Sequence, residues 1–304
     1  MKEKVNCLDD FLARRKPVLL DGATGTYLSR LGFNGLTPEL ACLTRPELVE
    51  KVHQDYVAAG ARIILTNTFG ANHLALGRKG LAGELERLNV AAVALAKGVK
   101  KKAPYILVAG DMGPAGELLE PFGSARPEKL LACFRQQARI LSEEGVDFFL
   151  LETFSDVAEA ALACQAVREV SSLPLVVSFT LQAGKQYRTM MGQSLRELAS
   201  WAEKENLAAL GFNCGLGSSQ MVEVALQTSR LTSLALWFKP NAGLPVLQQG
   251  KTVYPETPEE FSSNCLKIVA AGACFLGGCC GTGPEHIKFL AGQLALLSGK
   301  ATAS

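Results

Sequence analysis

The chain has 304 residues, of which 48% are hydrophobic and 20% are charged. These values fit one large globular domain with a core of full size, and barrels of about 250 residues are common as single units. The 31 basic and 29 acidic side chains leave a formal charge of +2. Because no basic run is interleaved with aromatic residues, the composition argues against nucleic acid or a membrane surface as the partner.

The N-terminal residues, Met1–Asp10, lack the apolar core of a signal sequence. No uninterrupted apolar run approaches the ~18 residues that indicate a membrane span. The nine cysteines are odd in number and lack the spacing of a small disulfide-rich domain. In a reducing compartment, such thiols serve packing or metal binding. We therefore expect a soluble cytoplasmic protein.

Short, β-rich apolar runs recur along the chain, and each is followed by a segment with helical periodicity. The runs begin near Val18, Arg62, Tyr105, Asp147, Pro174, Ala208, Leu234 and Ala273. Eight units at a mean spacing of roughly 36 residues are typical of a (β/α)8 barrel. A doubly wound sheet usually has fewer strands and a glycine-rich phosphate turn after the first. The sequence therefore predicts one α/β domain over residues 1–304, a (β/α)8 TIM barrel.

Polar or sulfur-bearing side chains stand at the ends of the predicted strands. In chain order they are Asp21, Asn67, Asp111, Glu152, Cys214, Asn241, Cys279 and Cys280. In a barrel of parallel strands, all the C-terminal strand ends face one mouth, where active sites are assembled. These residues are therefore predicted to converge, although they are spread over most of the sequence.

Two adjacent cysteines, Cys279 and Cys280, lie between glycines at a predicted junction of strand and helix. Neighbouring residues on a regular strand point to opposite faces, so two thiolates can bind one ion only where the backbone turns sharply. The flanking glycines allow such a turn. Cys214 is a third glycine-bounded cysteine after an apolar run, and three ligands with one open position are typical of catalytic zinc. The alternatives are a disulfide within the adjacent pair, or three ordinary buried cysteines.

Thr282 and Glu285 follow the cysteine pair at the spacing of a capping box. This pattern predicts that the last helix begins immediately after the pair. Free amide groups and the positive end of the helix dipole would then face the thiolates, whose negative charge such an end favours.

A zinc ion held by three thiolates carries a net charge of about −1, which makes it a poor electrophile for activating water. Zinc hydrolases generally use neutral histidine ligands, whereas His53, His73 and His286 are better explained by packing or solvation. Soft sulfur ligands suit a soft incoming ligand, and the metal would deprotonate a substrate thiol at the open position. The expected reaction is alkyl transfer to a thiol.

Four segments of the chain resemble the zinc-dependent homocysteine S-methyltransferase family, in the family's order and over nearly the whole length. They are Asp21–Thr26, Thr66–Ala71, Gly211–Gly215 and Gly277–Thr282, of which the last, with its double cysteine, is the most specific. The resemblance implies a (β/α)8 barrel in which Cys214, Cys279 and Cys280 bind Zn²⁺. It also implies an enzyme that binds the sulfur of homocysteine at the fourth position as a thiolate and methylates it to methionine.

The resemblance further implies roles for other strand ends. Asp21 and Glu152 would receive the ammonium group of homocysteine. Loop amides and polar side chains such as Asn67 and Thr68 would hold its carboxylate. For all four residues, the alternative is hydrogen bonding that only shapes the mouth of the barrel.

The segment Lys239–Pro245, followed by Gly250–Pro255, resembles the homocysteine-binding domain of cobalamin-dependent methionine synthase more than the betaine or S-methylmethionine branches. This likeness implies that Asn241 occupies the open zinc position before the substrate binds. Shaping of the loop alone is the alternative. The likeness also implies methylcobalamin as the methyl donor.

The chain has neither a folate-binding barrel nor a corrinoid module beside its own barrel. The corrinoid motif Asp-x-His-x-x-Gly is absent, because Lys51, Ala71 and Pro284 stand two residues before the three histidines. A separate corrinoid protein, or another part of a longer chain, would therefore supply methylcobalamin. The alternatives are S-methylmethionine or betaine as the donor, demethylation of a different methyl compound toward a corrinoid partner, and a zinc-thiolate module that binds without turnover.

Overall fold

In the computed structural model, which describes residues 7–13, 16–184 and 186–300, eight parallel strands form one sheet. The strands are β1 (Val18–Leu19), β2 (Ile63–Leu65), β3 (Leu107–Met112), β4 (Phe148–Phe154), β5 (Leu175–Phe179), β6 (Ala209–Gly217), β7 (Ala235–Asn241) and β10 (Ala273–Leu276). The sheet closes where β1 meets β2, because the amide of Asp21 donates to the carbonyl of Ile63. The predicted (β/α)8 barrel is confirmed, and each strand begins within two residues of a predicted run.

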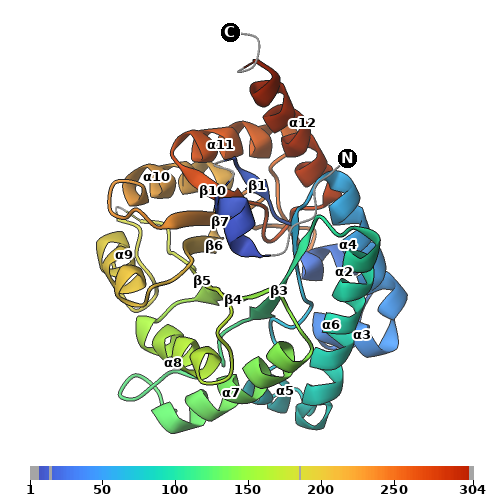
Figure 1. Ribbon diagram of the computed structural model, residues 1–304, viewed down its shortest axis with the longest axis vertical. Helices are drawn as coiled ribbons and strands as arrows, with labels where there is room; N and C mark the ends of the chain where they lie inside the picture. The colour runs from blue at the N-terminus through green and yellow to red at the C-terminus, as the bar shows by residue number, and fades with distance from the viewer. Residues whose placement is uncertain (1–6, 14–15, 185, 301–304) are drawn as a thin grey trace.

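The helices that follow the strands surround the sheet (Figure 1). They are α4 (Pro46–Ala59), α6 (Leu85–Lys102), α7 (Pro127–Glu143), α8 (Val157–Arg168), α9 (Leu195–Lys204), α10 (Ser218–Thr228), α11 (Pro258–Ala270) and α12 (Pro284–Lys300). Shorter helices lie in the loops after β1 and β2: α2 (Thr24–Arg30), α3 (Ala41–Thr44), α5 (His73–Gly77) and the 3-10 turns Pro38–Leu40 and Ala82–Glu84. Within the described ranges, none of these helices has the length and apolar character needed to cross a membrane.

The interior of the barrel is filled with side chains, and helix α1 (Leu8–Ala13) covers its N-terminal end (Figure 1). Inward-facing residues of the strands, among them Phe148 and Trp237, form one apolar cluster. Leu8 and Phe11 of α1 belong to the same cluster and are almost fully buried. Because side chains seal this end, the opposite end, at the C-terminal ends of the strands, is where a ligand can enter.

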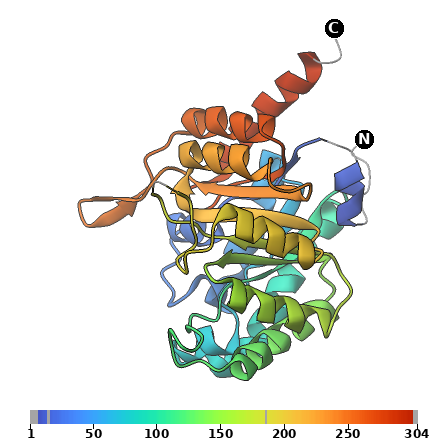
Figure 2. The ribbon, with the colours of Figure 1, turned by 90° about the vertical axis from the view of Figure 1, so that its left-hand side faces the viewer.

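A hairpin of β8 (Val246–Gln248) and β9 (Lys251–Val253) is inserted between β7 and α11. It extends away from the barrel at the end opposite α1 (Figure 2). Its two turn residues have positive φ angles of 49° and 73°, as expected for a two-residue hairpin loop. Leu247 is 76% exposed. The insertion therefore places an apolar protrusion beside the mouth.

The predicted capping box of Thr282 with Glu285 is wrong. Helix α12 begins at Pro284, so Thr282 lies before the helix cap. Its hydroxyl instead donates to the carbonyl of Cys279 at 2.7 Å and accepts from the amide of Ala23 at 3.2 Å. A hydroxyl can donate and accept at once, so Thr282 joins the cysteine loop to the loop after β1.

Replacement of Phe11 by Ala should lower the free energy of unfolding by about 3 kcal/mol, because the ring is 3% exposed and its loss leaves a cavity under the barrel. Urea unfolding followed by circular dichroism measures the change. Phe122→Ala is the matched control, since that ring is 72% exposed and its loss should cost below about 0.5 kcal/mol. Equal losses for both variants would contradict the role of α1 as the cover of this end.

Candidate metal centre and active site

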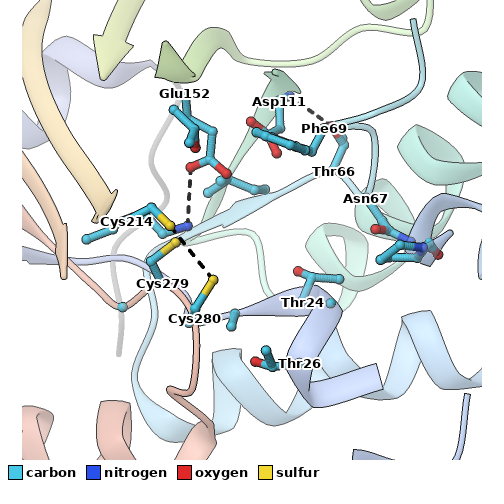
Figure 3. A pocket seen from close by; sticks show the side chains of 18 of the residues that line it. Thr24, Thr26, Thr66, Asn67, Phe69, Asp111, Glu152, Cys214, Cys279 and Cys280 are labelled. Carbon is cyan, nitrogen blue, oxygen red and sulfur yellow. Dashed lines mark hydrogen bonds and ion pairs between the residues drawn. The ribbon is translucent and has the colours of Figure 1, made fainter. Parts of the chain in front are cut away.

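The three predicted sulfur ligands meet at the mouth of the barrel (Figure 3). The Sγ atoms of Cys214, Cys279 and Cys280 all lie within 4.8 Å of one another, and those of Cys214 and Cys280 are 3.9 Å apart. Two sulfurs bound to one tetrahedral zinc at about 2.3 Å would be about 3.8 Å apart. All three cysteines are free in the structure, which does not form the alternative disulfide within the adjacent pair. Geometry and donor type therefore fit a thiol-ligated metal ion.

Turns with positive φ bring the sulfurs together. Cys214 has a φ of +57° and Gly215 a φ of +65°. A residue with a Cβ atom adopts this conformation at a cost of about 1–2 kcal/mol, and the turn releases the Cys214 side chain from the alternation of β6. Gly281 has a φ of +82°, and a Cβ atom there would lie 2.2 Å from Cβ of Tyr254. The turn after the cysteine pair therefore requires glycine for conformation and for space.

Asn213 supports the sulfur cluster from behind. It is fully buried, and its Nδ2 lies 3.9 Å from Sγ of Cys279 and donates to Oγ1 of Thr153 at 2.7 Å. Its Oδ1 accepts from the hydroxyl of Ser178 at 2.6 Å. Such partners orient metal ligands. The sequence analysis assigned Asn213 no role; its place directly before Cys214 was the only available signal.

The three sulfurs share charge unequally. Hydrogen bonds with the thiols of Cys214 and Cys279 lower the pKa of Cys280, and the phenol of Tyr254 acts in the same direction. The sulfur contacts raise the pKa of Cys279. Burial raises the pKa of Tyr254, so its phenol keeps its proton and can donate at neutral pH. Cys280 is therefore the thiol of the cluster that loses its proton most readily.

Asn241 lies beside the cysteine pair at the end of β7. Its two chain neighbours are bonded to the pair: the amide of Cys279 donates to the carbonyl of Pro240 at 2.8 Å, and the amide of Ala242 donates to the carbonyl of Cys280 at 3.0 Å. Asn241 is 3% exposed, and its Oδ1 has no hydrogen-bond partner among the described residues. An unpaired buried oxygen is costly, so this atom fits the prediction of an additional oxygen ligand.

A cavity of about 500 Å³ adjoins the sulfur cluster and is lined by all three cysteines (Figure 3). Asn67 and Glu152 also line it, as the sequence predicts for substrate contacts. Asp21, Thr68 and Asn241 are buried outside its lining. The structure therefore brings all the predicted site residues to the mouth, but only some of them face the space that a substrate would fill.

Lys239, to which the sequence analysis assigned no role, joins the two predicted carboxylates. Its Nζ donates to Oδ1 of Asp21 at 2.9 Å and lies 4.0 Å from Oε2 of Glu152. The other oxygen of Asp21 accepts from the amide of Leu65 at 2.8 Å. Burial by itself would lower the pKa of Lys239, but Asp21 and then Glu152 raise it, so the ammonium stays charged. In the sequence, the sign that could have pointed to Lys239 was a lysine at the end of an apolar run.

Asn67 and Thr68, the predicted contacts of the substrate carboxylate, are placed differently. Nδ2 of Asn67 donates to the carbonyl of Pro38 at 2.8 Å, and the side chain forms part of the cavity wall. Thr68 is fully buried, and its hydroxyl donates to the carbonyl of Asp111 at 2.6 Å. The role of both residues stays a prediction, and Asn67 is the better placed.

Fold and site together define a (β/α)8 barrel with a candidate thiol-ligated metal centre at its mouth. The family model described as homocysteine S-methyltransferase matches residues 18–294. The chain therefore belongs to the homocysteine S-methyltransferase family.

Two curated relatives are methionine synthases, from Mycobacterium tuberculosis and Mycobacterium leprae, which are 30% and 29% identical to this chain. Each alignment, over 294 residues, covers 90% of this chain and 24% of the relative. The chain thus spans about a quarter of the length of these relatives.

Among solved structures, the metallated form of the homocysteine methyltransferase MmuM from Escherichia coli is similar, with a TM-score of 0.80 and 25% identity. The match covers 94% of this chain and 99% of that chain. The carboxyl transferase domain of Rhizobium etli pyruvate carboxylase has a TM-score of 0.55 and 14% identity over 98% of this chain and 52% of its own, which shows a shared fold alone.

Incubation with Zn²⁺ followed by desalting should leave one ion per chain, and Cys280→Ala should weaken zinc binding by at least about tenfold, because it removes a ligand. Elemental analysis and titration with a zinc indicator measure these values. Cys164→Ala is the matched control: this cysteine is buried on α8 and should not affect zinc. Full zinc content in both Cys214→Ala and Cys280→Ala would contradict the assignment of the metal centre.

Proposed function

We propose that this chain is a homocysteine S-methyltransferase barrel in which Cys214, Cys279 and Cys280 hold Zn²⁺. The observation that carries the proposal is the meeting of three sulfurs, at a spacing suited to zinc, on the wall of a cavity. Membership of the family and the likeness to the metallated form of MmuM support it. When bound, zinc would supply the charge that turns the substrate thiol into a thiolate nucleophile. The free cysteines favour a reducing, cytoplasmic location.

In this proposal, homocysteine is oriented by charge. Glu152 presents a buried Oε2, without a hydrogen-bond partner in the described part of the chain, to the substrate ammonium. Asp21 acts on the same group mainly through Lys239, because both of its oxygens already have partners. Amides of the loop after β1, together with Asn67, receive the carboxylate, while Thr68 holds the neighbouring strand in place. The thiol is then left to approach the sulfur cluster.

Asn241 is proposed to fill the open position of the ion until the thiol arrives. Its buried and unpaired Oδ1, at the end of the strand between the two cysteine segments, supports this role. An amide oxygen is a harder and weaker ligand for zinc than a thiolate. The substrate sulfur can therefore displace it.

We further propose methylcobalamin, carried by a corrinoid protein or module, as the methyl donor. The resemblance of Lys239–Pro245 and Gly250–Pro255 to cobalamin-dependent methionine synthase supports this donor, and two curated relatives of the chain are methionine synthases. Exposed large apolar side chains also gather on the loops around the mouth: Leu36, Phe69, Leu118, Phe122, Met190, Leu244, Val246 and Leu247. An apolar rim of this kind is typical of a surface that binds a macromolecule, whereas a small donor such as betaine does not need one.

Methionine formation from homocysteine, measured by chromatography, should occur with methylcobalamin. With S-methylmethionine or betaine it should be at least about tenfold slower, which corresponds to an activation free energy at least about 1.4 kcal/mol higher. Cys280→Ala should abolish it, because the thiol would lose its activating centre. Turnover only with a sulfonium or betaine donor would reject the corrinoid donor.

A second measurement separates the enzyme from a module that binds zinc without turnover. X-ray absorption at the zinc edge should gain a fourth sulfur neighbour when homocysteine is added, because an incoming thiol fills the open position. Unchanged coordination at saturating homocysteine, together with no turnover from any donor, would reject the methyltransferase proposal.

A further inference from the structure

Asp111, at the C-terminal end of β3, is a cavity-lining acid to which the proposed function assigns no role. It is 4% exposed, and its Oδ1 has no hydrogen-bond partner within the described ranges. Asp111 and Glu152 both line the cavity, and each has one oxygen without a hydrogen bond, although that of Glu152 lies 4.0 Å from Nζ of Lys239 (Figure 3). Buried carboxylate oxygens are normally satisfied by donors. Two carboxylate oxygens without a hydrogen bond in the same wall therefore indicate a missing donor.

The backbone of Asp111 is held firmly although its carboxylate is left unpaired. The amide of Asp111 donates to Oγ1 of Thr66 at 3.0 Å, and its carbonyl accepts from the hydroxyl of Thr68 at 2.6 Å. The two hydroxyl oxygens are themselves 2.6 Å apart. These three contacts join the ends of β2 and β3 and leave little freedom for the residue to turn away. The Asp111 carboxylate is therefore held in place in the wall of the cavity.

The buried charges at the mouth also include more acids than bases. Four buried acids, Asp21, Glu39, Asp111 and Glu152, lie at the mouth with one buried cation, Lys239. Lys239 bonds to Asp21 and also lies near Glu152. Burial, followed by repulsion from Glu152, raises the pKa of Asp111 well above its usual range. A further cation beside Asp111 would offset both the cost of burying its charge and its repulsion from Glu152.

The missing cation is better matched by an ammonium group than by a second metal ion. In the described part of the chain, Cys214, Cys279 and Cys280 are the one group of at least three ligand residues close enough to hold a metal. A primary ammonium carries three donors on a compact charge, and it can bond to two carboxylates at once. Amino-acid substrates carry this group.

We propose that Asp111 shares the ammonium group of homocysteine with Glu152 and thereby selects thiols that carry an amine. This inference rests on the proposed function and adds a residue to it. Asp21 then serves as the anchor of Lys239, and Asp111 provides the direct contact. The pairing gives a role to Asp111 and Glu152, two lining acids to which the lysine of the cavity forms no hydrogen bond, since that lysine donates to Asp21.

The test compares homocysteine with two analogues in calorimetric titrations of the zinc-loaded full chain. One analogue, 4-sulfanylbutanoate, lacks the amine, and the other, 3-aminopropane-1-thiol, lacks the carboxylate. Asp111→Asn keeps the shape of the side chain and removes its charge. It should weaken binding of both amine-bearing thiols at least about tenfold, as loss of one buried charge pair does, and change binding of 4-sulfanylbutanoate by less than about twofold. Glu152→Gln should show the same selectivity.

Asp156→Asn is the matched control, because Asp156 follows β4 at the same end of the barrel but caps α8 by accepting from the amide of Ala158. Asparagine caps a helix equally well, so all three affinities should stay as in the wild-type chain. Equal weakening of all three ligands by Asp111→Asn, with zinc content retained, would mean that Asp111 only shapes the cavity and would overturn the inference. Unchanged binding of homocysteine would overturn it too.

The two proposals fail in different ways. Tight homocysteine binding by the wild-type chain, with no selective effect of Asp111→Asn, would remove the role of Asp111 and leave the methyltransferase proposal intact. A wild-type chain that binds zinc but not homocysteine would remove both. Elemental analysis of each variant ensures that a lost metal ion is not mistaken for a lost ammonium contact.

Discussion

The site depends on the convergence of three sulfurs over the end of one strand. In the sheet, β7 lies between β6, which carries Cys214, and β10, which precedes the cysteine pair. Ligands on two strands separated by a third would lie about 10 Å apart if the strands ran straight, but the sulfurs of Cys214 and Cys280 are 3.9 Å apart. The positive-φ turns at Cys214 and Gly281 account for the difference. The last residue of the strand between them is Asn241, which the proposed function assigns as a further ligand.

Electrostatics places a second constraint on the mouth. Buried acids and a buried lysine are expensive to remove from water, and the barrel concentrates them at the C-terminal ends of β1, β3, β4 and β7. Lys239 stabilises part of this charge through Asp21. Asp111 and Glu152 face the cavity, so in the proposed function the floor of the mouth receives a cationic group while one wall offers soft sulfur. A small molecule that carries both an ammonium and a thiol matches the two walls together.

Similarity of fold and similarity of the site can be distinguished by comparing the chain with its relatives. A carboxyl transferase domain with 14% identity shares the fold, and fold by itself does not imply function. The match to MmuM covers 99% of that chain, whereas the mycobacterial methionine synthases are matched over 24% of theirs. The same barrel unit therefore corresponds to nearly all of one relative and to a part of others. The loops of the mouth, with their exposed apolar rim, are where a difference in donor would act.

The sequence by itself determined the barrel and the sulfur cluster. Eight apolar runs with regular spacing predicted the strands, because periodic burial is a local property that each segment carries in its own residues. The glycine-bounded cysteines predicted the cluster, because glycine lets the backbone turn and aim neighbouring sulfurs at one point. The local pattern was misleading at Thr282, where a capping box was expected and a contact with the loop after β1 formed instead.

Only the tertiary structure decided which polar groups are satisfied and which remain open. Lys239 and Asp21 are 218 positions apart, so no local pattern could show that this lysine already occupies the predicted ammonium ligand. The unpaired oxygens of Asp111 and Asn241 likewise became visible only when all their neighbours were in place. Hydrogen-bond satisfaction depends on contacts between distant segments, and it is these contacts that separate a residue that binds from one that only shapes the mouth.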